Sequence, residues 1–143
     1  MDKTLFATAT TTIDAKPSVI WEALTTPEII KKYFFGADVV TDWREGSSII
    51  WKGEWNGKPF EDRGRIITVQ EKLQLKMTHW SASSGKPHTP ENENTLTFKL
   101  SEKDGKTEVT IVQDGNTSDK EREANEKNWT LLLKNLKTLL EKA

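Results

Sequence analysis

The C-terminal segment, residues 118–143, constrains the fold most strongly, because it has the pattern of one long amphipathic helix. Ser118 and Glu121 form a Ser-x-x-Glu capping box, in which each side chain accepts a hydrogen bond from the other residue's backbone N–H. A helix of this length spans roughly 35 Å, enough to cross a small domain. The apolar residues recur at steps of three and four, which places them on one face: Trp129, Leu132, Leu133, Leu136, Leu139 and Leu140.

The first half of the predicted helix differs from the second, because it contains no leucine before Leu131. Toward the body of the protein it offers only Ala124, Asn125 and Asn128. Two interpretations remain open. Either the first turns extend beyond the body, or the helix covers a core at one end and a pocket at the other.

Length and charge exclude several classes of protein. A chain of 143 residues predicts one domain, residues 1–143, and the absence of cysteine excludes disulfides and thiolate metal sites. With 21 basic and 22 acidic residues, the chain carries no charge excess that would favour nucleic acid. Residues 1–13 lack the pattern of a signal peptide, and no window approaches the roughly 18 apolar residues of a membrane span. We therefore expect a cytoplasmic protein without membrane insertion.

The N-terminal part predicts one strand followed by two short helices. Apolar and polar residues alternate over 5–13, as in a half-buried strand. Pro17 suits the first position of a helix. Thr26 is the expected cap of a second helix, which begins at Pro27 and ends before Gly36.

The middle of the chain predicts an antiparallel sheet, because its apolar segments are joined by hairpin turns. Asn56-Gly57 and Asp104-Gly105 are two-residue hairpin signals. The second turn places Leu100 opposite Val109, so the sheet has one apolar face that the C-terminal helix can cover. The expected strands are at about 38–42, 48–55, 58–69, 73–80, 94–102 and 107–114.

The same turns bring a carboxylate and an imidazole together on the apolar face. The Asn56-Gly57 turn places Asp62 opposite Trp51, and a turn over 69–72 places Asp62 opposite His79 and Ile66 opposite Leu75. A buried carboxylate needs a partner, which His79 can supply. Three interpretations stay open: a structural Asp–His pair, a polar anchor for a ligand, or an acid–base pair.

The face around Asp62 and His79 is also where we expect a small molecule to bind, under the first half of the C-terminal helix. The other members of this predicted ligand site come from the sheet and the helix, and all except Asn125 are apolar or aromatic: Trp51, Trp55, Phe60, Met77, Phe98, Asn125, Trp129 and Leu132.

Several segments together resemble one known family. These are Ile-Asp-Ala-Lys-Pro at 13–17, the stretch 19–28, Tyr-Phe at 33–34, Trp-Arg-Glu-Gly-Ser at 43–47, Gly64, and Asn128-Trp129 followed by leucines. The chain is similar to the family of homologues of the activator of heat-shock-protein-90 ATPase, in the START-like (SRPBCC) helix-grip superfamily. The family commonly has Gly-Trp where this chain has Asn128-Trp129. The resemblance implies an α+β fold with a seven-stranded antiparallel sheet, a long C-terminal helix, and two short helices between the first two strands.

The resemblance implies a cavity between sheet and helix that binds apolar molecules in many relatives. We therefore predict a binding module for a small apolar or lipid-like molecule rather than an enzyme. The alternatives are a cyclase- or hydrolase-type enzyme that uses Asp62 and His79, and an interaction protein that regulates a chaperone ATPase. No phosphate-binding loop, nucleophile elbow or metal-ligand spacing occurs in the sequence, so we expect neither cofactor nor metal.

Overall fold

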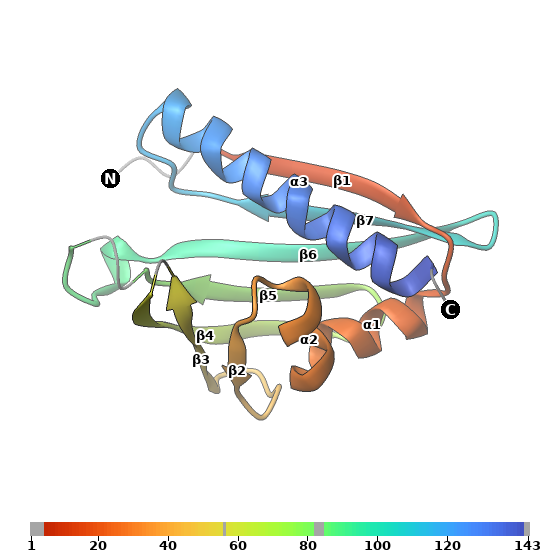
Figure 1. Ribbon diagram of the computed structural model, residues 1–143, viewed down its shortest axis with the longest axis horizontal. Coiled ribbons are helices and arrows are strands. Elements are labelled where there is room, and N and C mark those ends of the chain that lie inside the picture. The colour runs from red at the N-terminus through yellow and green to blue at the C-terminus, as the bar shows by residue number, and fades with distance from the viewer. Residues whose placement is uncertain (1–4, 56, 82–84, 142–143) are drawn as a thin grey trace.

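The computed structural model describes residues 5–55, 57–81 and 85–141, without the side chain of Trp55. Its seven strands form one antiparallel sheet in the order β1-β7-β6-β5-β4-β3-β2, and the predicted helix-grip fold is confirmed (Figure 1). The elements in chain order are β1 (Ala7–Ile13), α1 (Pro17–Thr25), α2 (Pro27–Tyr33), β2 (Asp38–Val40), β3 (Ser48–Trp55), β4 (Lys58–Gln70), β5 (Gln74–His79), the short helix η2 (Pro90–Asn92), β6 (Asn94–Lys103), β7 (Lys106–Gln113) and α3 (Asp119–Glu141).

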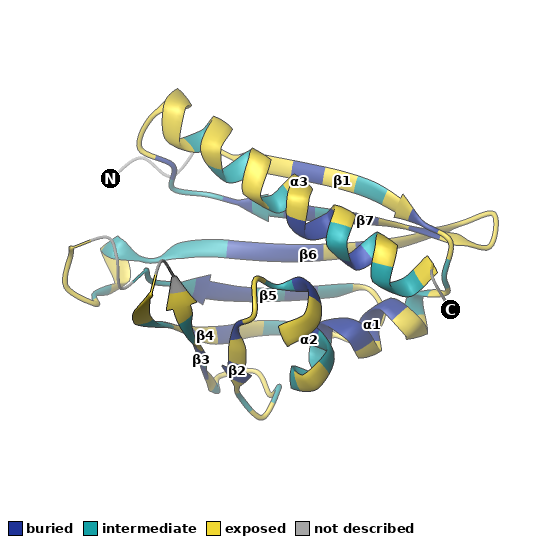
Figure 2. Ribbon diagram, in the orientation of Figure 1, coloured by how far each residue is buried: buried dark blue, intermediate teal, exposed yellow. Residues whose placement is uncertain are grey.

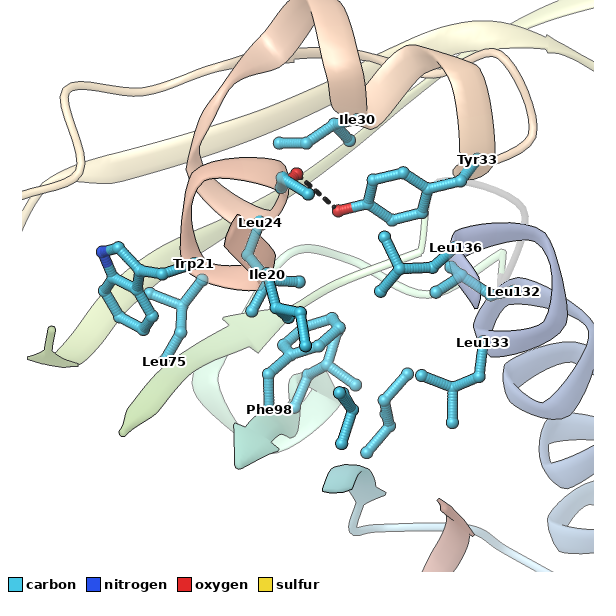
Figure 3. Close-up of a cluster of buried hydrophobic side chains, with 14 of the residues drawn as sticks. Ile20, Trp21, Leu24, Ile30, Tyr33, Leu75, Phe98, Leu132, Leu133 and Leu136 are labelled. Atoms are coloured by element: carbon cyan, nitrogen blue, oxygen red, sulfur yellow. Dashed lines mark hydrogen bonds between the residues drawn. The ribbon is translucent and has the colours of Figure 1, made fainter. Parts of the chain in front are cut away.

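The three α-helices cover the same face of the sheet. α3 crosses the half that contains β1 and β7, while α1 and α2 cover the half toward β2 (Figure 1). The core lies between these layers, where Ile20 of α1, Phe98 of β6 and Leu133 of α3 are buried (Figure 3). In Figure 2 the buried residues lie along the middle of β5 and β6, whereas the first turns of α3 are largely exposed.

A buried tyrosine joins the two short helices. The Tyr33 hydroxyl of α2 donates a hydrogen bond of 2.9 Å to the carbonyl oxygen of Ala23 in α1 (Figure 3). Burial raises the pKa of this phenol well above its ordinary value, because the anion would lose its hydration. The hydroxyl therefore stays protonated and holds α2 against α1.

α3 follows the predicted helix closely. Leu132, Leu133 and Leu136 are buried in the core. At its start the Glu121 N–H donates to the Ser118 hydroxyl at 3.1 Å, as the capping box predicts. The second half of the box differs, because the Glu121 carboxylate accepts from the backbone N–H and the hydroxyl of Thr117 instead of the N–H of Ser118.

No helix within the described ranges is both long enough and apolar enough to span a membrane. This includes α3, whose outer face is charged over most of its length.

Side chains of α3 also bind the free edge of β1. Glu126 accepts a hydrogen bond from the Thr8 N–H at 3.0 Å, and the Lys137 ammonium donates to the Thr12 carbonyl at 2.6 Å. Glu141 accepts from the Asp14 N–H at 2.8 Å. An edge strand otherwise presents unpaired backbone groups to other chains, so these contacts protect the edge while they position the helix.

The hairpin predictions hold where the structure describes them. Asp104 and Gly105 have φ angles of 53° and 79°, as a two-residue turn of this type requires, and Leu100 pairs with Val109. Trp55 pairs with Lys58, as an Asn-Gly turn predicts, although residue 56 itself lies outside the described residues.

The predicted register of β4 on β5 is wrong by two residues. Ile66 pairs with Met77 rather than Leu75, because β4 continues to Gln70 and carries a bulge between Ile66 and Thr68. Leu73, predicted on the inner face, lies in the turn between these strands and is 62% exposed. A shift of two residues preserves the face of each side chain, since the side-chain period of a strand is two.

Candidate functional site

A cleft of about 470 Å³ lies between the end of α2, the sheet and one side of α3. Leu131 of α3 and Phe35, which follows α2, are 47% and 43% exposed, so the cleft opens to solvent between them. Its lining is mostly apolar and comes from segments far apart in the sequence: Phe34, Phe35, Ala37, Trp51, Phe60, Asp62, His79, Leu96, Asn125, Asn128, Trp129 and Leu131.

Six of the ten predicted ligand-site residues line this cleft. The predicted inner faces of three neighbouring strands and of α3 bring them together. These residues are Trp51, Phe60, Asp62, His79, Asn125 and Trp129.

Three predicted residues lie in the core instead. Met77 and Phe98 are 3% and 4% exposed, and Leu132 is fully buried. They lie on the predicted faces of the sheet and helix but belong to the buried core cluster, as Figure 3 shows for Phe98 and Leu132. The side chain of Trp55, the remaining predicted residue, lies outside the described structure.

The sequence prediction missed the wall that follows α2. Phe34, Phe35 and Ala37 line the cleft there, and Phe35 has a left-handed backbone with a φ of 52°. The one signal that could have indicated this wall is the Phe-Phe-Gly sequence at 34–36, where two aromatic residues stand beside a glycine typical of the end of a helix.

Asp62 and His79 form the polar end of the cleft. His79 Nε2 lies 3.0 Å from Asp62 Oδ2, and the Trp51 ring packs edge-on against the imidazole with centroids 4.9 Å apart. The predicted contact between Asp62 and His79 is therefore present. The contact runs diagonally between the two strands. Because Arg63 pairs with Trp80, Asp62 and His79 are not directly opposite each other.

This pair offers several kinds of chemistry. Its side chains are 17% and 22% exposed for Asp62 and His79, so a molecule in the cleft can reach them. A carboxylate on one imidazole nitrogen fixes the ring orientation and leaves the other nitrogen to face elsewhere. The described ranges contain no group of three or more His, Asp or Glu side chains that could hold a metal ion.

Aromatic rings form the apolar walls. Phe34 packs edge-on against Trp129, with ring centroids 6.0 Å apart. On the sheet side, the Phe60 ring lies so close to Gly53 that a Cβ atom there would meet it at 2.8 Å. Gly53 therefore creates the space that Phe60 occupies in the cleft wall.

A second, polar groove of about 330 Å³ adjoins the cleft under the start of α3, and the two share His79, Asn125 and Trp129. Asn125 donates to the Asn116 side chain at 2.7 Å, and Asn116 in turn donates to the carbonyl oxygen of Gln113. The first half of α3 thus faces polar groups, whereas its second half contributes its own leucines to the core.

Trp80 and Trp43, which lie outside the cleft, are partly buried. Trp80 stacks on His88, and its indole donates to the Lys86 carbonyl at 3.1 Å. His88 Nε2 also lies 2.8 Å from a Glu93 carboxylate oxygen. Trp43 packs against the core.

An antiparallel sheet that holds one long C-terminal helix, with a cleft beside the helix, defines the START-like class of helix-grip proteins. Within this class, the family model "Activator of Hsp90 ATPase homolog 1-like protein" matches residues 14–141. The chain belongs to this family, as the sequence resemblance predicts.

Solved structures include one relative of considerable sequence similarity. ChR145 from Cytophaga hutchinsonii is 45% identical, with a TM-score of 0.86 over 99% of this chain and 97% of that chain. The Aha1 dimer from Colwellia psychrerythraea is 23% identical, with a TM-score of 0.73 over 95% and 96% of the two chains. CalU16 from Micromonospora echinospora is 21% identical, with a TM-score of 0.73 over 92% and 73%. The last two show similarity of fold. No curated protein sequence matches this chain significantly.

Proposed function

We propose that this protein binds a small, mostly apolar molecule in the cleft between α3 and the sheet. The observation that carries the proposal is the cleft itself, which has aromatic walls and a polar pair at one end. Its volume of about 470 Å³ lies within the range of roughly 300–1,000 Å³ that is typical of small-molecule sites.

The lining supports binding in a defined orientation. Phe60 and Trp129 are partly exposed and offer aromatic surface whose burial against a ligand is favourable, while the buried Trp51 lines the cleft beside them. Asp62 and His79 concentrate the hydrogen-bonding capacity at one end, so a ligand with one polar group has a single favourable direction of entry.

An acid–base enzyme is the second candidate, because the Asp62–His79 contact of 3.0 Å lies in the wall of the cleft. In that case a substrate group would exchange a proton with the imidazole while Asp62 orients the ring. Turnover that is lost in both His79→Gln and Asp62→Asn, while ligand affinity is retained, would favour this alternative over a binding module.

Regulation of a chaperone ATPase is the alternative suggested by the family description. Such an interaction protein would need an exposed contact surface. The partly buried positions of Trp80 and Trp43, together with the open cleft, favour the binding module. Chaperone ATPase activity that rises on addition of this protein, with the cleft filled by mutation, would support the alternative.

Native mass spectrometry of protein purified from its own source tests the proposal directly. We expect a non-covalent adduct of small-molecule mass that disappears on denaturation and is recovered in an organic extract. Protein that carries no adduct, and that also binds none of a set of neutral apolar probes, would contradict the proposal.

A further inference from the structure

The ionisable groups around the cleft are predominantly acidic. Among the described residues that line the cleft, Asp62 and His79 are the ionisable ones. The adjoining groove adds three carboxylates and one ammonium group: Glu91, Glu93, Glu121 and Lys86. Counted with neutral histidines, these groups give the region around His79 an excess of negative formal charge.

Aromatic rings line the same cleft as the Asp62–His79 pair. Trp51 contacts the His79 ring, and Phe60 and Trp129 line the same cleft. The faces of aromatic rings attract cations, and indole does so most strongly. A carboxylate beside aromatic walls is thus complementary to an organic ammonium group, whose charge meets Asp62 while its carbon chain contacts the rings.

An anionic ligand would fit this site poorly. Its carboxylate would have to lose hydration beside Asp62, and two like charges at short distance repel strongly in an apolar site. Lys86 lines the groove and not the cleft, so it is not among the residues that an anionic group in the cleft would contact. A neutral ligand escapes the repulsion but gains no charge interaction.

We propose that the cleft selects organic cations, namely apolar molecules with one ammonium group that lies beside Asp62 among the aromatic rings. This inference rests on the proposed small-molecule function and names the chemical class of ligand.

Isothermal titration calorimetry with three probes of equal chain length tests the selection: decylammonium, decanol and decanoate. We expect decylammonium to bind at least about tenfold more tightly than decanoate, with decanol between them, because a charge pair and cation–π contact are present for the amine alone. Asp62→Asn keeps the shape of the side chain and an oxygen for His79. It should lower the affinity for decylammonium severalfold, leave that for decanol nearly unchanged and raise that for decanoate.

Glu22→Gln, which removes one exposed carboxylate on α1, is the matched control and should leave the order of affinities unchanged. Retained decanol binding by Asp62→Asn shows that this variant is folded. Decanoate that binds as tightly as decylammonium, or a preference for the amine that survives in Asp62→Asn, would overturn the inference while the proposed function stands. If the wild type binds none of the three probes, the proposed function fails together with the inference.

Discussion

The Trp129 indole of α3 donates a hydrogen bond of 2.8 Å to the side-chain oxygen of Gln113 at the end of β7. This bond holds the indole between the core and the cleft, where its ring also packs against Phe34. Gln113 is 7% exposed, so its amide oxygen depends on this donor more than a solvated oxygen would.

Trp129→Phe should therefore lower the free energy of unfolding by about 1–3 kcal/mol, since it leaves a buried acceptor unsatisfied and removes part of the ring. Denaturant unfolding measures this loss. Gln113→Met, alone and combined with Trp129→Phe, completes a double-mutant cycle that isolates the bond. Losses that simply add would show that the two side chains do not interact in solution.

The leucines of α3 should differ strongly in their contribution to stability. Leu136 is fully buried, so Leu136→Ala should cost about 2–5 kcal/mol through lost burial and a residual cavity. Leu131 is 47% exposed on the same helix, so Leu131→Ala is a matched control with an expected change within about 0.5 kcal/mol. Similar losses for both in urea unfolding would contradict the orientation of α3.

Two glycines in neighbouring strands should respond oppositely to alanine. At Gly53 the added methyl meets only the end of the Phe60 ring, at 2.8 Å, so the ring can move into the cleft. Gly53→Ala should weaken binding of apolar probes with little loss of stability. At Gly64 the methyl would lie 1.9 Å from the Thr78 carbonyl oxygen, in the backbone of β5.

Gly64→Ala should therefore destabilise the protein by more than about 2 kcal/mol, because β4 and β5 must separate to admit the methyl. Thermal unfolding of the two variants, measured together with probe binding, separates the effects. A Gly64→Ala protein as stable as wild type would show that the strands are further apart than described.

Acid should weaken the contact between α3 and β1. The pKa of Glu141 is lowered below its ordinary value of 4.5, first by the hydrogen bond from the Asp14 N–H and then by Lys137. A lowered pKa in the folded state means that this group contributes stability fully above pH 4.5 and loses it as pH falls through the folded value.

Glu141→Gln should thus reduce stability at neutral pH and flatten the decline of stability below pH 4.5. Urea unfolding at a series of pH values measures both effects. Glu22→Gln, on an exposed face of α1, should keep the decline of the wild type. An unchanged decline in Glu141→Gln would show that the carboxylate does not hold the helix to the strand.

Rules that depend on few neighbouring residues predicted much of this fold. The spacing of the leucines determined the buried face of α3, and Asp104-Gly105 determined the register of β6 on β7. The register of β4 on β5 was not predictable in the same way. It depends on a bulge after Ile66 and on a turn without a strong signal, where Lys72 adopts a positive φ of 67°.

The candidate site was predictable only in part, because periodicity gives the face of a side chain but not its depth under the covering layer. Met77 and Trp51 both point to the inner face and both are buried, yet Trp51 lines the cleft while Met77 does not. The missing wall at Phe34 and Phe35 depends on how the chain turns after α2, which no repeating pattern encodes.

Binding of N-phenylnaphthylamine, a neutral apolar fluorophore, to a cleft-filled variant tests the proposed ligand site most directly. Asn128 is exposed on α3 and lines the cleft, so Asn128→Trp should fill the space without disturbing the core. Thr130→Trp places the same ring on the opposite, solvent side of the helix, outside the cleft lining. We expect saturable binding by the wild type and by Thr130→Trp, and at least about tenfold weaker binding by Asn128→Trp, since one lost apolar contact of this size is worth roughly 1.4 kcal/mol or more. Equal affinity of all three proteins, or no binding by the wild type, would contradict the assignment of the cleft as a ligand site.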